Sequence, residues 1–437
     1  GVESKELYSL AIHVKHVPSP ANPMEEVTQV WMLAPRDYTE GNVDYVDSEE
    51  KILLAFLEAV KTHNPQVFIG WNVVQFDFDF LIGKYQRFGL PMNFGIGARP
   101  LDHFKGKNNR DLYMKIPGRA VLDGIPTLRA LGFQMERWSL DHVSRELLGE
   151  GKLISPDEDK IAEIEALFKD NKAALADYNL KDTTLVTRIF EKAEVLEVLM
   201  ERQGLSGTLI EKQNFPSEIL DSLYLPALHR LRLAGPTTPT GNLSFGSQEQ
   251  KPIRKGVPGY FSDVAELSFA DFLPNLLESF LIDPLGRALG EWLPDEGYAI
   301  PGNALRFHRT QHLLPAIFSE LKKHEGADAG AVGKAAHSLR QALRQALDSQ
   351  YSRFYSPSQN AALRHIATLL IAETNLFLES LGMRILLADL ESIFFHKPDG
   401  KIGNEFLPAL ASHLASWSEK TFHLKTSVTP VLIGHYG

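Results

Sequence analysis

Cysteine is absent from the sequence, so disulfide bonds and thiolate metal ligands are excluded. Carboxylate and histidine side chains remain as metal ligands, and we expect any catalytic metal to be a hard, oxygen-preferring ion such as Mg²⁺ or Mn²⁺. The 437 residues also lack an apolar run near bilayer length and an N-terminal pattern of charged and then apolar residues. We therefore expect neither export nor membrane insertion.

Basic residues are outnumbered, because 45 Lys and Arg stand against 55 Asp and Glu, for a net charge of −10. This balance argues against a protein that coats nucleic acid by bulk charge, but it permits an enzyme with a local basic groove. Lys251, Arg254 and Lys255 are the candidate for such a groove, with a solvated loop as the alternative interpretation.

Alternating strand and helix patterns predict a mixed α/β sheet in the first half of the chain. The expected strands are 6–15, 25–35 and 66–72, and the expected helices are 48–65 and 78–89. Residues 206–258, rich in Pro, Gly, Ser, Thr and Gln, are expected to form a linker or mobile loop. We therefore expect one domain at 1–205 and a second at 259–437, with further helices at 314–323, 335–350 and 361–382.

Two carboxylates, Asp77 and Asp79, stand inside one of the most apolar runs of the chain, residues 68–89. Burying an unpaired carboxylate is costly, so acids in such a run are usually paired, hydrogen-bonded or bound to metal. One alternative is structural, with Asp77 capping the helix that follows. Farther along, Tyr178 and Asp182 lie four residues apart in a helical segment, so their side chains share one face and can converge on one point.

The spacing Asn72-x-x-x-Phe76-Asp77, followed later by Tyr178-x-x-x-Asp182, resembles the second and third motifs of DEDD-type three-prime exonucleases with tyrosine. Residues 118–129 and 140–152 also resemble that domain in family B DNA polymerases, particularly the bacterial DNA polymerase II branch. The resemblance covers residues 6 to 200 and implies an RNase H-like exonuclease domain.

By this resemblance, Asp77 and Asp182 would hold two divalent ions, Mg²⁺ or Mn²⁺, about 3.5–4 Å apart. Tyr178 would help position the attacking water. Asn72 and Phe76 would support the strand-to-helix corner and contact the terminal nucleotide of DNA.

The first motif of the family, Asp-x-Glu, has no complete counterpart in the sequence. Alignment without gaps places it immediately before residue 1, whereas a gapped alternative puts Glu3 at the glutamate position and Gly1 at the aspartate position. Without the aspartate the metal site would lose a central ligand, and nuclease activity would be severely impaired unless residues upstream supply it. Asp79 has no counterpart in the motifs and is interpreted as structural or solvent-facing.

Residues 268–275 resemble the first palm motif of the same polymerases, with two changes. Ser268 stands where the family has a metal-binding aspartate, and Leu273 stands where it has the tyrosine that screens the ribose. Asp271 lies three residues too late to substitute without a rebuilt turn.

The fingers helix and the acidic hairpin are also altered. Arg344 takes the place of the fingers lysine and offers positive charge to a triphosphate, while Asp348 takes the place of asparagine and would oppose it. Asp389 and Glu391 hold the two acid positions of the hairpin, and their i, i+2 spacing predicts one strand face. They would be residual palm acids for metal, or alternatively two paired acids on a half-buried strand.

The overall prediction is an RNase H-like exonuclease domain followed by a divergent palm and fingers region of α+β structure. We expect three-prime to five-prime hydrolysis of DNA at a primer terminus or single-stranded three-prime end, and an inactive polymerase region. The alternatives are a polymerase that still synthesises and a non-catalytic DNA-binding or scaffolding protein. Replication or repair proteins are the expected partners, no membrane is involved, and the expected location is the bacterial cytoplasm at the nucleoid.

Overall fold

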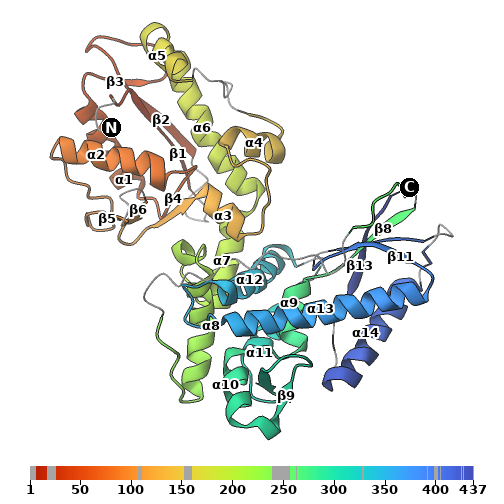
Figure 1. The fold of residues 1–437 in the computed structure, drawn as a ribbon. Coiled ribbons are helices and arrows are strands. Elements are labelled where there is room, and N and C mark those ends of the chain that lie inside the picture. The colour runs from red at the N-terminus through yellow and green to blue at the C-terminus, as the bar shows by residue number, and fades with distance from the viewer. Residues whose placement is uncertain are drawn as a thin grey trace. The chain divides into compact units, whose positions relative to one another are not determined.

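The computed structural model describes most of the chain (Figure 1). The described residues are 6–16, 26–106, 111–151, 160–238, 256–261, 263–326, 329–390, 392–397, 402–403, 405–424, 426 and 428–436. Of the residues singled out above, Gly1, Glu3, Lys251, Arg254, Lys255 and Glu391 lie outside the described residues. The chain divides into unit 1, residues 1–201 with 209–214, and unit 2, residues 202–208 with 215–437.

The described part of unit 1 contains three small sheets. In the first, β1 (Ser9–Lys15) pairs antiparallel with β2 (Glu26–Leu33), which pairs parallel with β3 (Asp44–Val46). In the second, β4 (Val67–Gly70) and β7 (Ala120–Asp123) are parallel, with Gly70 opposite Asp123. The third is the antiparallel hairpin of β5 (Asp102–Lys105) and β6 (Leu112–Lys115).

The helices of unit 1 follow the predicted order. They are α1 (Glu49–His63), α2 (Asp79–Arg87), α3 (Gly124–Ala130), α4 (Leu140–Leu148), α5 (Lys160–Asp170), α6 (Lys172–Lys192) and α7 (Val195–Ser206), which continues into unit 2. Ser48 caps α1 by accepting the N–H of Lys51, which confirms the predicted helix start. Gly89 ends the α2 segment with φ of 64°, as expected for a residue that closes a helix.

Helices α1 and α2 pack with residues of the first and second sheets in one buried cluster of unit 1. Leu10 of β1 and Phe68 of β4 pack against the same buried cluster, so the two sheets share one core. The ammonium group of Lys84, 1% exposed, lies 2.5 Å from the carboxylate of Glu49, and this ion pair ties α2 to α1. The helix that follows the β4 corner is therefore fixed in place.

Unit 2 is built on an antiparallel sheet in the order β11-β12-β8-β13, with helices packed against it (Figure 1). Its strands are β8 (Val264–Phe269), β11 (Arg384–Ala388), β12 (Ile393–His396) and β13 (Pro430–Tyr436), with a separate pair β9 (Gly297–Ala299) and β10 (Arg306–His308). Its helices are α8 (Pro216–Arg230), α9 (Phe272–Ser279), α10 (Pro284–Trp292), α11 (Leu314–Lys322), α12 (Gly330–Asp348), α13 (Pro357–Ser380) and α14 (Phe406–Phe422).

Helix α8 corrects the prediction of a linker or mobile loop across 206–258. Residues 216–230 are helical, and Ile219, Leu220 and Tyr224 are fully buried in the core of unit 2. This part of the range is an integral helix, whereas residues 239–255 lie outside the described residues.

Helix α13 is long and apolar enough, by length and composition, to cross a membrane, contrary to the expectation that no such run exists. Its inward face, which includes Leu363, Ile366 and Leu370, is buried in the core of unit 2. Core helices of ordinary globular domains pass the same test, so this finding alone gives weak support for a membrane span.

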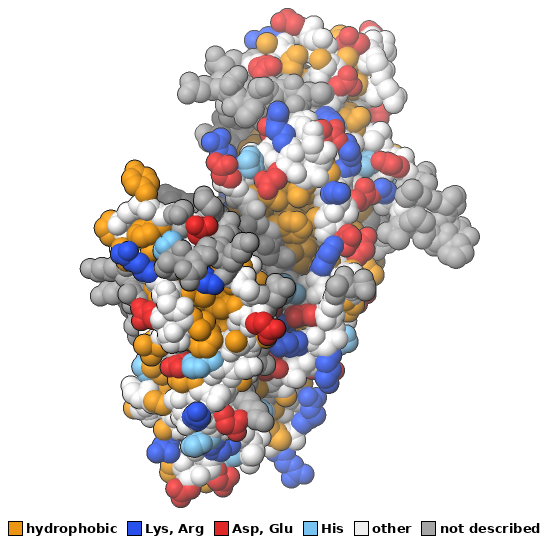
Figure 2. Space-filling model, turned by 90° about the vertical axis from the view of Figure 1, so that its right-hand side faces the viewer, with side chains coloured by type: hydrophobic (Ala, Val, Ile, Leu, Met, Phe, Trp, Pro, Cys, Tyr) orange, Lys and Arg blue, Asp and Glu red, His pale blue; other side chains and the backbone are white. Residues whose placement is uncertain are grey.

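On the face drawn in Figure 2, basic and acidic side chains are interspersed.

Candidate active site

The chain leaves β4 through a sharp corner that carries Asn72, Phe76 and Asp77. Asn72 adopts the left-handed conformation with φ of 58°, which asparagine tolerates better than most residues. Its carbonyl accepts the N–H of Phe76 at 3.0 Å, and the N–H of Phe78 reaches back to the carbonyl of Val73 at 2.8 Å. Residues Val74–Phe78 therefore form a turn of π-helix before α2 begins.

The π-turn sets where the corner side chains point. It holds about one residue more than an α-helical turn, so the side chains after it are rotated by about 100° from their α-helical directions. Asn72 and Asp77 are exposed, and Phe76 is 69% exposed although it is a large aromatic side chain. The corner thus presents an amide, an aromatic ring and a carboxylate to the surroundings.

Asp77 does not cap a helix, so the structural alternative considered for it is wrong. The residues at the cap positions are Val73 for the π-turn and Phe78 for α2, and neither segment has a side-chain cap. Asp79, in contrast, is structural, because its carboxylate lies 2.7 Å from the ammonium group of Lys105 on β5.

Asp123, at the end of β7, holds the corner through hydrogen bonds to its backbone. Its carboxylate accepts the backbone N–H of Asn72 at 3.1 Å and of Val74 at 3.4 Å, and it also caps α3 through the N–H of Ile125 at 3.2 Å. Burial raises the pKa of Asp123, and the backbone N–H groups oppose that rise. Asp123 was not predicted as a site residue, although an aspartate between the strand at 120–123 and the helix that follows is a helix-cap signal.

Two further contacts fix the same corner. The side-chain amide of Gln75 both donates to the carbonyl of Leu112 at 3.0 Å and accepts its N–H at 2.9 Å, which ties the π-turn to β6. The indole N–H of Trp71 donates to the carbonyl of Trp138 at 3.0 Å. The backbone around Asn72 is therefore held from three directions, which favours a rigid site.

Helix α6 supplies Tyr178 and Asp182, which share one face as their spacing predicted. Tyr178 is 5% exposed and hydrogen-bonded to Asp182. Burial, followed by the charge of Asp182 and this hydrogen bond, raises the pKa of Tyr178 well above its usual range, so the phenol stays protonated at neutral pH. The phenolic proton is thus held beside a carboxylate.

Polar contacts fix the register of α6 on the sheet. The ring Nδ1 of His13 on β1 lies 2.8 Å from the hydroxyl of Thr187, and Asn179 donates to the hydroxyl of Ser9. Helix α6 also packs against β4, the strand that ends at the corner. The fold therefore brings the helix with Asp182 and the strand that leads to Asp77 into one packed arrangement.

The donor set of unit 1 fits a hard divalent cation, because Asp77 and Asp182 offer carboxylate oxygens. The position expected for a third acid, Glu3, is outside the described residues. Within the described part of the chain, three potential ligands converge elsewhere, at Asp271, Glu325 and His337 in unit 2.

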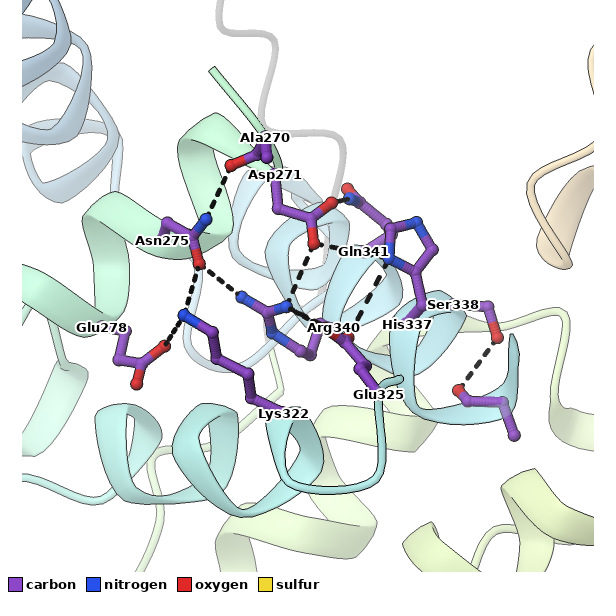
Figure 3. A network of polar contacts seen from close by, with 11 residues as sticks. Ala270, Asp271, Asn275, Glu278, Lys322, Glu325, His337, Ser338, Arg340 and Gln341 are labelled. Atoms are coloured by element: carbon purple, nitrogen blue, oxygen red, sulfur yellow. Dashed lines mark hydrogen bonds and ion pairs between the residues drawn. The ribbon is translucent and has the colours of Figure 1, made fainter. Parts of the chain in front are cut away.

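That second cluster contains an internal cation (Figure 3). The guanidinium of Arg340, 1% exposed, donates to Glu325 at 2.8 and 3.0 Å, to Asp271 at 3.1 Å and to the side-chain oxygen of Asn275 at 2.8 Å. Gln341 donates to the other oxygen of Asp271 at 2.9 Å. Because a guanidinium already binds both carboxylates, a metal ion at the same oxygens would face its positive charge.

The network joins the loop after β8 to the helix α12. Asp271 stands at the start of α9 with φ of 43° and no side-chain cap bond, so its carboxylate is turned toward α12. Burial raises the pKa of Asp271, but hydrogen bonds from His337 and Gln341 and the nearby charges of His337 and Arg340 bring it below its usual value. The hydrogen bond to Asp271 in turn raises the pKa of His337.

The other palm and fingers residues are also engaged internally. Arg344 is 7% exposed, and its guanidinium lies 2.5 Å from the carboxylate of Asp348 one turn along α12. Ser268 lies on β8 opposite Val431. The positive charge expected to meet a triphosphate is therefore balanced within its own helix.

Glu391, the expected partner of Asp389 on one strand face, lies outside the described residues. Asp389 itself lies in the turn between β11 and β12. Its N–H donates to the carbonyl of Ser392 at 3.1 Å, and its carboxylate accepts the N–H of Ser392 at 2.8 Å. Strands β11 and β12 pair antiparallel, so the chain reverses between them. The hydroxyl of Ser392 donates to Glu266 at 2.7 Å, which links the turn to β8.

Comparison with known proteins agrees with this architecture. Residues 11–143 match the exonuclease domain of DNA polymerase family B, a range that contains the Asn72–Asp77 corner and ends before α6. Residues 11–143 are thus similar to a family B exonuclease domain. Domains of this family are metal-dependent and RNase H-like, so the predicted fold class of the first half is confirmed.

Relatives extend the similarity into unit 2. DNA polymerase II of Escherichia coli (strain K12) is 30% identical over 412 residues, which cover 90% of this chain and 52% of that protein. The DNA polymerase delta catalytic subunit of Schizosaccharomyces pombe is 23% identical over 308 residues, or 63% of this chain and 27% of that protein. The chain thus spans about half the length of its bacterial relative, and the predicted resemblance to family B DNA polymerases is confirmed.

A solved structure supports the fold of the whole chain. The family B DNA polymerase from the hyperthermophilic archaeon Pyrobaculum calidifontis matches with a TM-score of 0.64 at 15% identity, covering 98% of this chain and 57% of that one. The similarity includes the α+β region, so unit 2 has the fold of a polymerase region although several motif residues differ.

Proposed function

We propose that unit 1 hydrolyses phosphodiester bonds from the three-prime end of DNA with Mg²⁺ or Mn²⁺. The observation that carries the proposal is the anchored corner at Asn72–Asp77, which presents Asp77 beside the exposed ring of Phe76. The Tyr178–Asp182 pair on α6, a helix packed against β4, supports it further.

Each residue of the site would have a distinct task. Asp77 and Asp182 would hold the ions, which, when bound, would activate the nucleophile and stabilise the leaving oxygen. Tyr178, kept protonated by its surroundings, would orient the attacking water through its hydroxyl group. Phe76 would stack on the terminal base, because an exposed ring accepts any base on its face.

For unit 2 we propose a non-catalytic role, in holding DNA or in contacting replication or repair proteins. The support is that its acids and bases neutralise one another. Asp271 and Glu325 bind Arg340, and Asp348 binds Arg344. Nucleotidyl transfer needs carboxylates from two strands around two ions. Ser268 supplies none at the motif position of β8, and the acid of that strand, Glu266, accepts a hydrogen bond from Ser392.

The test is a primer-extension assay with a five-prime-labelled primer–template, all four deoxynucleotides and Mg²⁺ or Mn²⁺, beside an Asp182→Ala variant. We expect the primer to shorten with the unchanged chain and to stay intact with the variant. A primer of unchanged length, with DNA binding retained, would exclude both enzymatic functions and leave the non-catalytic scaffold function. Lengthening would show that unit 2 still synthesises DNA.

A further inference from the structure

We propose that Asp123 is a positioning residue for Asp77, an inference that rests on the exonuclease function proposed for unit 1. Asp123 is 8% exposed and stands at the end of β7. The parallel register pairs it with Gly70, the last residue of β4. Its carboxylate is therefore placed beside the point where the chain leaves β4 and turns toward Asp77.

The carboxylate acts on the corner through the backbone. One oxygen accepts the N–H of Asn72 and the other that of Val74, so the two oxygens hold the Trp71–Asn72 and Val73–Val74 peptide groups. Asn72 sits in the left-handed region, a conformation that persists for a non-glycine residue when its surroundings over-determine it. The π-turn that starts at Val74 carries Asp77, so the position of the Asp77 carboxylate depends on the two hydrogen bonds that Asp123 accepts.

Packing leaves the corner little room to adjust without Asp123. A Cβ atom at Gly124, the residue after Asp123, would lie 2.6 Å from the ring of Trp71, and one at Gly70 would lie 2.4 Å from Val73. The ring of Trp71 and the side chain of Val73 thus lie in close contact with the backbone at Gly124 and Gly70. A shift of the corner would therefore displace the π-turn rather than be absorbed by empty space.

The alternative is that Asp123 is only the cap of α3, through the N–H of Ile125. Serine separates the two roles, because it caps helices well but has one short side-chain oxygen that cannot bond both Asn72 and Val74. Asparagine is the milder change, because it keeps one acceptor and turns an NH₂ group toward a backbone N–H. Ser48→Ala removes the cap of α1 in the same unit and serves as the matched control.

The experiment compares Asp123→Ser, Asp123→Asn and Ser48→Ala with the unchanged chain by two measurements. Amide hydrogen exchange reports protection at Asn72 and Val74, and titration with Mn²⁺ followed by electron paramagnetic resonance reports metal affinity, with Asp182→Ala as the reference for a lost ligand. We expect exchange at the corner to rise about two- to tenfold in Asp123→Ser, as for a lost hydrogen bond. We expect its Mn²⁺ affinity to fall about 10- to 100-fold, as for other outer-shell partners of metal ligands.

The outcomes separate this inference from the proposed function. Faster exchange with weaker Mn²⁺ binding in both Asp123 variants, and neither change in Ser48→Ala, supports positioning. Unchanged exchange at the corner, or faster exchange with unchanged Mn²⁺ affinity, overturns it while leaving the exonuclease proposal intact. If the unchanged chain binds Mn²⁺ no better than Asp182→Ala, the proposed function fails, and the positioning role fails with it.

Discussion

Replacing Arg340 by methionine should destabilise unit 2 by about 3 kcal/mol. The change keeps a long side chain but removes a 1%-exposed guanidinium from Asp271, Glu325 and Asn275. Removing one partner of a buried ion pair costs about 3–5 kcal/mol, because the other charge stays buried without compensation. The side chains of Asp271 and Glu325 are 19% and 20% exposed, so water would screen them in part and the lower end applies.

Native-state hydrogen exchange along α12 measures this loss within unit 2 without assuming that the whole chain unfolds in two states. A loss of about 3 kcal/mol corresponds to roughly 100-fold faster exchange at the most protected amides of α12. Lys323→Met is the control, because Lys323 pairs with Glu320 at the surface and its loss should leave exchange unchanged. The triple variant Arg340→Met, Asp271→Asn and Glu325→Gln should regain part of the protection, because it leaves no partly buried charge without a partner.

An exchange rate along α12 that rises less than threefold in Arg340→Met would refute this reasoning, because it would mean that the network adds little to the stability of α12. Mn²⁺ offers a second test. Without the guanidinium, Asp271, Glu325 and His337 still have oxygen and nitrogen atoms within 4.8 Å of one another. Mn²⁺ should therefore restore protection in Arg340→Met and have no such effect on the unchanged chain.

Three further predictions concern single side chains. His337→Asn should flatten the pH dependence of the stability of unit 2. The raised pKa of His337 contributes stability that is fully present below pH of about 6.5 and is lost as pH rises through the folded pKa. Denaturation curves recorded across this pH range check the prediction. Gly124→Ala should cost unit 1 about 1–3 kcal/mol by overpacking against Trp71, measured by thermal unfolding. Phe76→Ala should weaken single-stranded DNA binding by about 1–3 kcal/mol in fluorescence anisotropy.

Elements whose signals are local could be predicted from the sequence. The helix expected at 48–65 forms at Glu49–His63 because its periodic apolar face and the Ser48 cap lie within one segment. The strand expected at 66–72 forms at Val67–Gly70 and is followed by the expected corner. Tyr178 and Asp182 meet because helical spacing alone puts them one turn apart.

Features that depend on distant residues could not be predicted in the same way. The π-turn at Val74–Phe78 has no local sequence rule, and the role of Asp123 depends on a register between β4 and β7. Helix α8 was hidden by its prolines, which resembled turn signals. Pro216 stands at the first helical turn, where a missing N–H costs nothing, and Pro226 is accommodated inside a helix whose buried face packs into the core.

The acids of the two units differ in their exposure, and this difference supports different roles. In unit 2 the carboxylates of Asp271 and Glu325 bind a buried arginine of the same unit, so the fold itself supplies the cation. In unit 1 the exposed carboxylate of Asp77 stands on a backbone that Asp123 and Gln75 hold in place. A backbone held in one conformation that presents an exposed acid next to the exposed ring of Phe76 is suited to binding an external ligand. Added divalent cations should therefore act on unit 1, and the acids of unit 2 should remain bound to Arg340, which links α12 to the start of α9 and to the segment after α11.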